Sequence, residues 1–459
     1  MSKVTVDELR EAIGGNLIKG DPNTMVTGIM SRYHLVKPGM LYFDVKGGRG
    51  GNLNIIEALK KGAVGLVISK HKKVLPFKDT GIPVITVPKV REAFWRAVGF
   101  YRNKHDIPVV GVTGTSGKTT TKEMIASIFR RRWKTLKTVG NLNLPCFVPE
   151  HVLRLRSGYQ AAVFEIGMNR PGHVSGQSRL LRPKVGIITH IGQGHVEHLG
   201  TPEDVIREKA GIMEGIPGDG YLILNADDPN TKKVDLTGFK GQILYYGLKN
   251  KADYKACDIE TGELGTSFSV ILNGKKDRFF IPTFGTHNVY NALAAITTAR
   301  VFGFTAGEIR KGLAGYRKPP MRLQLHKGIK NCTLINDTYN ANPDSVMAGL
   351  EVLSSLGRGK TAVAVLGNML EQGRYAKESH RRVGQKAAEL KVDWLVTVGA
   401  LAREIAKGAA RGTKDMKIWS FLLRQQAVEF LKNNLPNNAV VLVKGSRGAF
   451  LERVVRHLR

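Results

Sequence analysis

The sequence predicts an α/β protein of three domains: a small α/β N-terminal domain, a central domain on a mostly parallel sheet, and a doubly wound C-terminal domain. The chain has 459 residues, which at roughly 150 residues per domain is enough for about three hydrophobic cores. Apolar residues make up 42% of the chain and charged residues 24%, values that exclude a disordered or fibrous protein. Short apolar runs alternate with helical patterns along most of its length, which indicates βαβ units.

The first domain is expected over residues 1–104. Its N-terminal segment, MSKVTVDELREAIGG, reads as a short amphipathic helix that ends at two glycines. Apolar runs at 65–69 and 83–87 are predicted to be strands, and a helical pattern follows from Val90 to about Tyr101. A polar stretch then marks the boundary to the next domain.

The second domain is expected over residues 105–316 and the third over residues 317–459. In both, apolar runs are followed by turn residues and helical segments, which is typical of a parallel sheet with crossover helices. The sequence YRKPP separates the two domains. The predicted strands are 107–112, 161–166, 185–189 and 221–224 in the second domain, and 333–336, 361–366, 394–398 and 439–444 in the third.

The charge of the chain is unusual. Lys and Arg number 70 against 38 Asp and Glu, which leaves a formal charge of +32. Such a surface attracts polyanions, so nucleic acid, an anionic membrane face and a phosphate-bearing substrate all remain open as partners. The basic residues are dispersed, and we expect most of them to form solvated faces rather than one binding patch.

Cysteine usage and the absence of long apolar runs indicate a cytoplasmic protein. Cys146, Cys257 and Cys332 lie far apart and form no CxxC pair, which argues against a disulfide framework and against a thiolate metal site. The N-terminus lacks the apolar stretch of a signal peptide. No apolar run approaches the roughly 20 residues that span a bilayer, so we expect no transmembrane segment.

The strongest chemical signal is IPVVGVTGTSGKTTTKEM, residues 107–124. A β-run leads into a glycine-bearing turn, and an amphipathic helix starts near Thr119. Backbone N–H groups, a helix N-terminus, a lysine and a hydroxyl are the groups that hold a nucleotide's phosphates and Mg²⁺. Val112 occupies the place of the first glycine in the strict GxxxxGK[ST] motif, so an ordinary glycine turn is the alternative. We predict nucleoside triphosphate binding by Gly114, Thr115, Ser116, Gly117, Lys118, Thr119 and Thr120.

An acidic metal ligand is expected at the end of a neighbouring strand, where Glu165 lies in AAVFEIGMN. The segment THIGQGHVEHLG offers His190, His195, Glu197 and His198 further along the chain. The spacing of two of these histidines could mimic a zinc site, but no further ligand pair lies at a convincing interval, so zinc is disfavoured.

Seven segments, taken in order, carry a family resemblance. They are TGTSGKTTTKEM, FEIGMNRPG, ITHIGQGHVEHLGTPEDVIREKA, LNADDPN, GTHNVYNALAA, INDTYNANPDSV and VLVKGSRGAFLERVV. The same order is found in the muramyl-peptide (Mur) ligases, which the chain resembles over its central and C-terminal domains. The resemblance implies an N-terminal domain for a UDP-sugar acceptor, a central P-loop ATPase and a Rossmann-like C-terminal domain.

The resemblance also implies an ADP-forming, ATP-dependent amide ligase of cell-wall peptidoglycan synthesis. ATP phosphorylates a substrate carboxylate, and an amine then displaces phosphate from the acyl phosphate. Such an enzyme mainly positions its reactants and neutralises charge. The most similar family members join D-Ala-D-Ala to UDP-MurNAc-tripeptide, and we expect the same anionic nucleotide-sugar peptide and dipeptide amine here, with a monomeric enzyme.

The resemblance assigns roles to the central domain. Lys118 should hold the β- and γ-phosphates, Thr119 and Glu165 the first of two Mg²⁺ ions, and His195 the second. Lys209 falls at the family's carbamylated lysine, a metal-organising anion. A lysine must be neutral to take up CO₂, so a depressed pKa is implied there. The alternative is an ordinary helix-face lysine. Lys118, His195 and Lys209 are thus the expected catalytic residues.

The remaining expected site residues bind ATP or substrate. Asn288 and Asn291 resemble adenine-side contacts, although alone they would read as helix-capping residues. Arg322 and Asp337 should reach ATP only when the C-terminal domain swings in, which implies that closure gates catalysis. The expected substrate residues are Ser31 and Arg32 for uridine, and Tyr339, Asn340 and Asn342 for the amine; Lys444, Ser446 and Arg447 also match the family.

Departures from the family pattern cluster around the acceptor. Met30 replaces an aspartate before the Ser-Arg pair, Asn368 stands in place of another aspartate, and residues 141–154 lack an Asn pair and an Ile-Gly step. A Mur-type ligase for a different acid and amine, such as a pseudomurein peptide ligase or a paralogue, is therefore an alternative. A basic P-loop ATPase that binds nucleic acid is a second alternative, but no stacking platform or helicase motif set supports it. A non-catalytic nucleotide-binding scaffold conflicts with the complete catalytic set.

Overall fold

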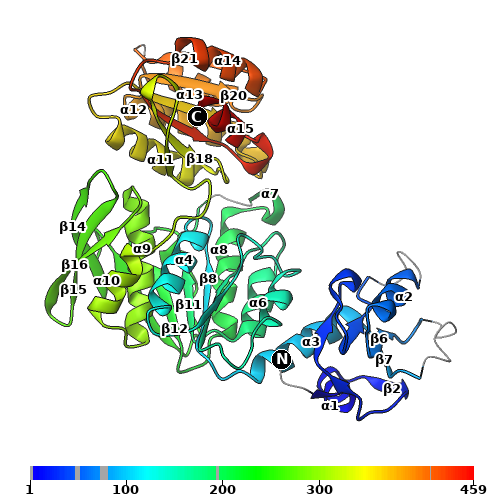
Figure 1. Cartoon of the computed structure of the whole chain (residues 1–459). Coiled ribbons are helices and arrows are strands. Elements are labelled where there is room, and N and C mark those ends of the chain that lie inside the picture. The colour runs from blue at the N-terminus through cyan, green and yellow to red at the C-terminus, as the bar shows by residue number, and fades with distance from the viewer. Residues whose placement is uncertain (1–3, 47–51, 73–80, 193–195, 414) are drawn as a thin grey trace.

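The computed structural model describes residues 4–46, 52–72, 81–192, 196–413 and 415–459, and they form three α/β lobes in chain order (Figure 1). Each lobe carries its own mostly parallel sheet. The predicted α/β class with a small N-terminal lobe, a central lobe and a Rossmann-like C-terminal lobe is confirmed. No helix in the described ranges is long and apolar enough to cross a bilayer.

The N-terminal lobe contains a sheet in the order β2-β7-β6-β5-β4, of which only β2 pairs antiparallel. Helix α1 starts with a capping box in which Thr5 and Glu8 exchange hydrogen bonds, and it ends at Gly14 with a φ of 65°. The strands are β1 (Val4–Thr5), β2 (Asn16–Lys19), β3 (Met25–Val26), β4 (Gly28–Met30), β5 (Met40–Phe43), β6 (Gly65–Ser69) and β7 (Val84–Val87); the helices are α1 (Val6–Ile13), α2 (Leu53–Lys60) and α3 (Val90–Asn103).

The central lobe is built on a sheet in the order β16-β15-β14-β13-β12-β11-β8-β10-β9. Strands β8 to β14 run parallel, whereas β15 and β16 extend the sheet as antiparallel strands. The strands are β8 (Val109–Thr113), β9 (Thr135–Lys137), β10 (Ala161–Glu165), β11 (Val185–Ile188), β12 (Tyr221–Asn225), β13 (Gln242–Gly247), β14 (Tyr254–Thr261), β15 (Thr266–Leu272) and β16 (Lys275–Ile281). The helices are α4 (Lys118–Phe129), α5 (Val148–Val152), α6 (His173–Leu181), α7 (Val196–Leu199), α8 (Pro202–Ala210), α9 (Thr286–Val301) and α10 (Ala306–Ala314).

The C-terminal lobe has a sheet in the order β17-β18-β22-β19-β20-β21, parallel except for β17. The strands are β17 (Gln324–Lys327), β18 (Thr333–Asp337), β19 (Ala362–Gly367), β20 (Trp394–Val398), β21 (Lys417–Phe421) and β22 (Val440–Lys444). The helices are α11 (Pro343–Leu356), α12 (Ala376–Glu389), α13 (Arg403–Ala410), α14 (Arg424–Asn434) and α15 (Glu452–Leu458).

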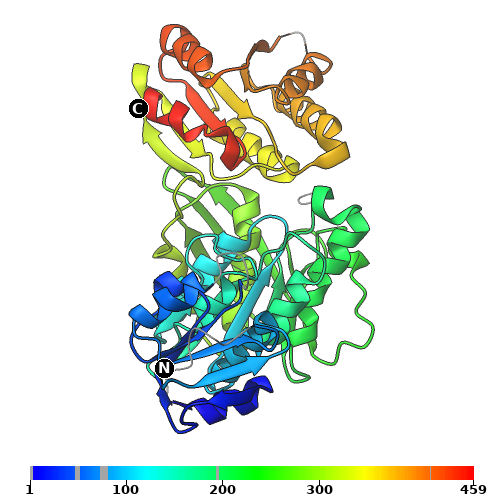
Figure 2. The same ribbon diagram turned by 90° about the vertical axis from the view of Figure 1, so that its right-hand side faces the viewer.

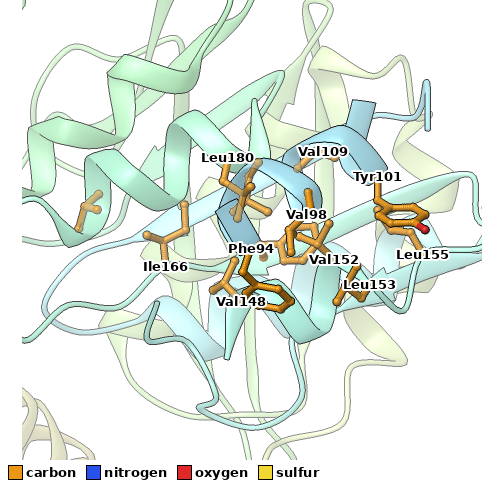
Figure 3. Packing of buried hydrophobic residues seen from close by; sticks show 14 of the residues in the cluster. Phe94, Val98, Tyr101, Val109, Val148, Val152, Leu153, Leu155, Ile166 and Leu180 are labelled. Atoms are coloured by element: carbon orange, nitrogen blue, oxygen red, sulfur yellow. The ribbon is translucent and has the colours of Figure 1, made fainter. Parts of the chain in front are cut away.

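Helix α3 joins the N-terminal lobe to the central lobe. Figure 3 shows Phe94 and Val98 of α3 beside Val148 and Val152 of α5, with Leu180 of α6 nearby. All five side chains are buried in one apolar cluster, so the contact excludes water in the manner of a domain core. In both views the C-terminal lobe lies on the opposite side of the central lobe from α1 (Figure 1 and Figure 2).

Candidate active site

The loop between β8 and α4 can be formed only with glycine at two positions. Gly114 has a φ of 140°, and a Cβ there would lie 2.1 Å from Thr189 Oγ1. Gly117 has a φ of 87°, and a Cβ there would lie 2.3 Å from Asn291 Oδ1. Side chains other than hydrogen would therefore be strained by the backbone and would clash with buried polar groups. The glycines keep the loop's backbone close to the start of α4, as a phosphate-binding loop requires.

Lys118 is the first residue of α4. Its Nζ donates hydrogen bonds to the carbonyl oxygens of Gly114 and Thr115, at 2.8 and 3.1 Å. Burial lowers the pKa of Lys118, while the nearby carboxylate of Glu165 opposes this shift. The lysine charge is thus held directly over the glycine-bearing loop. Thr120 is buried in the same first turn of the helix.

A threonine hydroxyl and a buried carboxylate meet beside this loop. Thr119 Oγ1 donates to Glu165 Oε1 at 3.1 Å, and Asn143 Nδ2 donates to the same oxygen at 2.7 Å. Glu165 lies at the end of β10 and is only 1% exposed. Its second oxygen, Oε2, is buried and accepts no hydrogen bond in the described structure. One carboxylate oxygen is therefore left for another positively charged group.

Lys122, which is not among the residues predicted from the sequence, contributes to the same centre. It is fully buried, and its Nζ lies 3.6 Å from Glu165 Oε2 and 3.2 Å from Glu123 Oε1. The Nζ donates to the carbonyls of Thr138 and Gly140, at 2.9 and 3.0 Å. Its position in KTTTK, four residues after Lys118, could have indicated this role from the sequence, since residues four apart share one helix face.

Lys209 of α8 lies in the interior rather than on the solvent face of its helix. Its Nζ is buried and makes no hydrogen bond among the described residues. Burial and the charge of Lys118 hold the pKa of Lys209 well below its ordinary value. The adjacent Glu208 does not pair with it, because the Glu208 carboxylate accepts from the backbone of Gly172 and Val174, each at 2.7 Å. The reading of Lys209 as an ordinary helix-face lysine is wrong.

His195 and the side chain of His198 lie outside the described residues, so the structure says nothing of them. Within the described ranges, no three or more His, Cys, Asp or Glu side chains are grouped to hold a metal ion. The ligand atoms that Thr119 and Glu165 themselves offer are oxygens, the donors that Mg²⁺ prefers. They fit a magnesium ion held jointly with a nucleotide better than a closed zinc site.

Two asparagines lie where α9 meets the glycine-bearing loop. Asn291 Oδ1 accepts from Thr121 Oγ1 at 3.2 Å, and Asn291 Nδ2 donates to Asn288 Oδ1 at 3.1 Å. Asn288 Nδ2 donates in turn to the carbonyl of Phe284 at 2.7 Å. His287 directly precedes Asn288, and burial lowers the pKa of its ring to about 4. These side chains fix the N-terminal turn of α9 against α4.

The C-terminal lobe already contacts the loop. Arg322 Nη2 donates to Thr119 Oγ1 at 3.1 Å, and its guanidinium lies 4.4 Å from the ring centre of Tyr339. Asn342, the N-cap of α11, donates through Nδ2 to Ser116 Oγ at 3.1 Å. Sequence reasoning placed these residues in one site, and the structure brings them together across two lobes.

Asp337 and Asn340 gather where β18 and β22 end. Lys444 Nζ lies 2.5 Å from Asp337 Oδ2 and donates to the carbonyl of Asn340 at 3.1 Å. Ser446 Oγ donates to the Ala341 carbonyl at 3.2 Å. Polar groups outside the carboxyl ends of parallel strands are the usual position of a ligand site in open α/β sheets.

Ser31 and Arg32 follow β4 in the N-terminal lobe. Arg32 Nε lies 2.6 Å from Glu150 Oε1, and its guanidinium lies 5.2 Å from the ring centre of Phe147. Its Nη2 also donates to the Cys146 carbonyl at 3.4 Å. Arg32 therefore ties the N-terminal lobe to residues 146–150 of the central lobe, a contact that sequence reasoning did not predict.

Comparisons with known proteins agree with this geometry. The family profile "Mur ligase middle domain" matches residues 112–299, and the profile "Mur ligase, glutamate ligase domain" matches residues 321–447. The UDP-N-acetylmuramoyl-tripeptide--D-alanyl-D-alanine ligase of Bacillus subtilis is 32% identical over 100% of this chain and 99% of its own.

Two solved structures are similar over almost the whole chain. A crystal structure of MurF from Acinetobacter baumannii is 29% identical, with a TM-score of 0.88 over 99% of this chain and 98% of its own. MurF ligase from Thermotoga maritima in complex with ADP is 25% identical, with a TM-score of 0.80 over 94% and 96%. With its glycine-bearing loop, its carboxylate at the end of β10 and full-length similarity of this degree, the chain belongs to the Mur ligase family.

Proposed function

We propose that this protein is an ATP-dependent, ADP-forming ligase that joins D-alanyl-D-alanine to UDP-N-acetylmuramoyl-tripeptide. The observation that carries the proposal is the cluster of Lys118, Thr119, Glu165 and Lys209 beside the loop, in a chain that matches a ligase of that name over its full length. Such a cluster suits phosphoryl transfer, in which charge neutralisation and positioning provide most of the catalysis.

The reaction needs two displacements. A carboxylate oxygen of the tripeptide attacks the γ-phosphorus of ATP and ADP leaves, which forms an acyl phosphate. The dipeptide's amine then attacks the acyl carbon, loses a proton, and displaces inorganic phosphate. A carboxylate alone is a poor electrophile, so the phosphoryl group supplies the leaving group. Lys118 and the loop's N–H groups, from Gly114 to Thr120, would bind the phosphates, and Arg322 would neutralise charge from the opposite lobe.

The same cluster fits two Mg²⁺ ions and a carbamylated lysine. Thr119 and Glu165 would hold one ion, supported by the buried Glu165 Oε2, which accepts no hydrogen bond from the described residues and lies 3.6 Å from Lys122 Nζ. His195 and Lys209 would hold the other. Bound Mg²⁺ would neutralise negative charge on the phosphates. The buried Lys209 amine has a depressed pKa and no hydrogen-bond partner among the described residues, as a neutral amine that takes up CO₂ would.

Substrate binding follows the lobes. We assign residues 1–104 to the UDP-sugar acceptor, with Ser31 and Arg32 at the uridine, residues 105–316 to ATP, and residues 317–459 to the amine. Asn288 and Asn291 would face the adenine, and Asp337 the nucleotide from the opposite lobe. Tyr339, Asn340 and Asn342 would contact the amine. We place the reaction in the cytoplasm, where its nucleotide substrates are available, and expect a monomer.

The experiment is a phosphate-release assay with purified protein, ATP and Mg²⁺. UDP-MurNAc-tripeptide and D-Ala-D-Ala are supplied singly and together, and the product is identified by mass spectrometry. Phosphate is expected only when both are present, with one amide product per phosphate. Activity with another acid and amine but not with this pair would support the pseudomurein-type or paralogue alternative. Hydrolysis stimulated by DNA or RNA alone would support the nucleic-acid-binding ATPase.

A further inference from the structure

His190 lies between two carboxylates that belong to different lobes. It follows β11 in the central lobe, and its Nδ1 lies 3.3 Å from Asp228 Oδ2. Its Nε2 lies 3.3 Å from Asp344 Oδ2, in the first turn of α11 in the C-terminal lobe. Neither the Mg²⁺ ligands proposed above nor the phosphate-binding groups include this histidine.

The central-lobe side of this bridge is rigid. Asp228 is 3% exposed, and its Oδ2 also accepts hydrogen bonds from the Ile191 backbone at 2.7 Å and from Thr231 Oγ1 at 2.9 Å. These bonds hold the carboxylate in one orientation. The pKa of Asp228 is lowered, because the bonds to His190 and its neighbours outweigh the effect of burial. His190 therefore faces a fixed negative charge whatever the C-terminal lobe does.

The C-terminal side of the bridge adjoins the phosphate loop. A Cβ at Gly192 would lie 1.8 Å from Asp344 Oδ2, so only glycine permits this close approach. Gly192 exchanges hydrogen bonds with Thr115 of the loop, at 3.1 and 3.2 Å. Two residues before Asp344, Asn342 contacts Ser116 of the same loop. The first turn of α11 thus meets the loop through Asn342 and meets His190 through Asp344.

The charges around the ring favour its protonated form. Burial lowers the pKa of His190, but the two carboxylates of Asp228 and Asp344, each 3.3 Å from a ring nitrogen, outweigh burial and raise the pKa to about 10. A cavity of about 490 Å³ adjoins the pair, and its other charged lining residues are Glu351 of α11 and Arg382, Lys386 and Glu389 of α12. Water in this cavity would screen the pair, so the contact should weaken with salt.

We propose that His190 is a positioning residue for the C-terminal lobe: its ring joins Asp228 to Asp344 and so seats the first turn of α11 on the phosphate loop. In this arrangement Asn342 and Arg322 face the loop together. The role deepens the proposed ligase function, because it concerns how the second lobe is brought to the nucleotide. The role concerns the equilibrium between two positions of the C-terminal lobe, and this equilibrium can be measured without catalytic turnover.

The test measures the distance between the lobes in the full-length protein. Cys146 and Cys257, the two exposed cysteines, are replaced by Ser. Spin labels are attached to Lys311→Cys on α10 and Gln425→Cys on α14, both exposed positions. Distance distributions are recorded by pulsed electron paramagnetic resonance at pH 7. In this background, His190→Gln and Asp344→Asn should both move population from the distance of the parent protein to longer or more varied distances.

Glu351→Gln is the matched control, because it removes the same charge from the same helix and the same cavity. It should leave the distribution as in the parent protein. Unchanged distributions in both His190→Gln and Asp344→Asn would overturn the proposal, as would an equal change in Glu351→Gln. Circular dichroism of each variant establishes that it is folded, and Asp344→Asn alone decides the matter if His190→Gln does not fold.

The charge on His190 provides a second measurement, the pH dependence of the distance between the lobes. Seating of α11 brings Asp344 to the ring and raises the His190 pKa, so seating takes up a proton and weakens as pH rises toward 10. The parent protein should shift toward longer distances between pH 7 and pH 9.5, and Asp344→Asn should shift less; equal shifts in both would contradict the proposal. If the ligase assay is negative while these shifts occur, the proposed function fails and the positioning role stands.

Discussion

Arg322 Nη2 and Thr119 Oγ1 lie 3.1 Å apart, although the two residues are 203 positions apart in the chain. The hydroxyl accepts this bond while it donates to Glu165 Oε1. One threonine thus links the expected Mg²⁺ carboxylate to the C-terminal lobe. Because the Arg322 guanidinium also lies over the ring of Tyr339, its position is fixed from two directions.

We predict that Arg322→Lys lowers kcat about 10- to 100-fold, because an ammonium cannot stack on Tyr339 and donate in the same planar geometry. Steady-state phosphate release at saturating ATP measures the effect. Arg453→Lys is the control, since Arg453 also lies over an aromatic ring, that of Phe450, away from the loop. Equal losses in both variants would show that the effect of Arg322 is not local to the site.

Lys209→Ala should reduce phosphate release by at least about 1,000-fold and recover part of it with added acetate, because the missing group is an anion. Lys118→Ala should be as inactive and should not recover, because the group lost there is a cation. The measurement is phosphate release with and without acetate in each variant. Rescue of Lys209→Ala by methylamine instead of acetate would mean that Lys209 acts as an amine, and the carbamate would be abandoned.

The sequence was informative wherever a feature is local. Buried strands such as β6 and β20 were predicted with their observed bounds, because continuous apolar runs are typical of parallel strands covered on both faces. Strands β15 and β16 were not predicted. In β16, KKDRFFI, the buried residues Asp277, Phe279 and Ile281 alternate with more exposed ones, and the charged residues at its start hide the apolar face from a search for apolar runs.

In the site, too, local features could be predicted from the sequence and contacts between distant residues could not. Glycines, Lys118 and Thr119 are recognisable because the phosphate loop is one continuous segment. Lys122, Asn143 and His190 were not assigned roles, because their roles depend on partners brought near by folding. Asn143 is 22 positions from Glu165, and His190 is 154 positions from Asp344. Side-chain spacing in one sequence does not reveal such contacts.

If Arg32 binds the acceptor in addition to pairing with Glu150, Arg32→Gln should raise the KM for UDP-MurNAc-tripeptide about tenfold. The KM for ATP should be unchanged. Glu150→Gln is the matched variant, because it breaks the tie between the lobes and leaves the guanidinium in place. Glu150→Gln should raise the KM for UDP-MurNAc-tripeptide less than Arg32→Gln does. If the two variants raise this KM equally, Arg32 acts only as the tie between lobes.

Acid should destabilise the protein partly through His151. Its Nε2 lies 3.1 Å from the Leu142 carbonyl, and burial lowers its pKa to about 4. The unfolded chain, with a pKa near 6.5, binds the proton first, so stability is full above that pH and falls as pH decreases toward 4. Between pH 7 and pH 5 this single group should cost about 2 kcal/mol of unfolding free energy.

Urea unfolding at pH 7 and pH 5 measures this dependence. His151→Gln should be less stable than the parent at pH 7 and should lose about 2 kcal/mol less between the two pH values. His457→Gln is the control, because His457 is exposed on α15. The same pH dependence in His151→Gln and the parent would refute the assignment.

Transfer of oxygen from the acid substrate to phosphate tests carboxylate activation most directly. UDP-MurNAc-tripeptide with oxygen-18 in its terminal carboxylate is incubated with ATP, Mg²⁺ and D-Ala-D-Ala, and the released phosphate is analysed by phosphorus NMR. Each phosphate should contain one oxygen-18 atom, because the attacking carboxylate oxygen leaves with the phosphoryl group when the amine displaces it. Unlabelled phosphate, released in step with amide formation, would contradict an acyl phosphate and with it the proposed chemistry of this site.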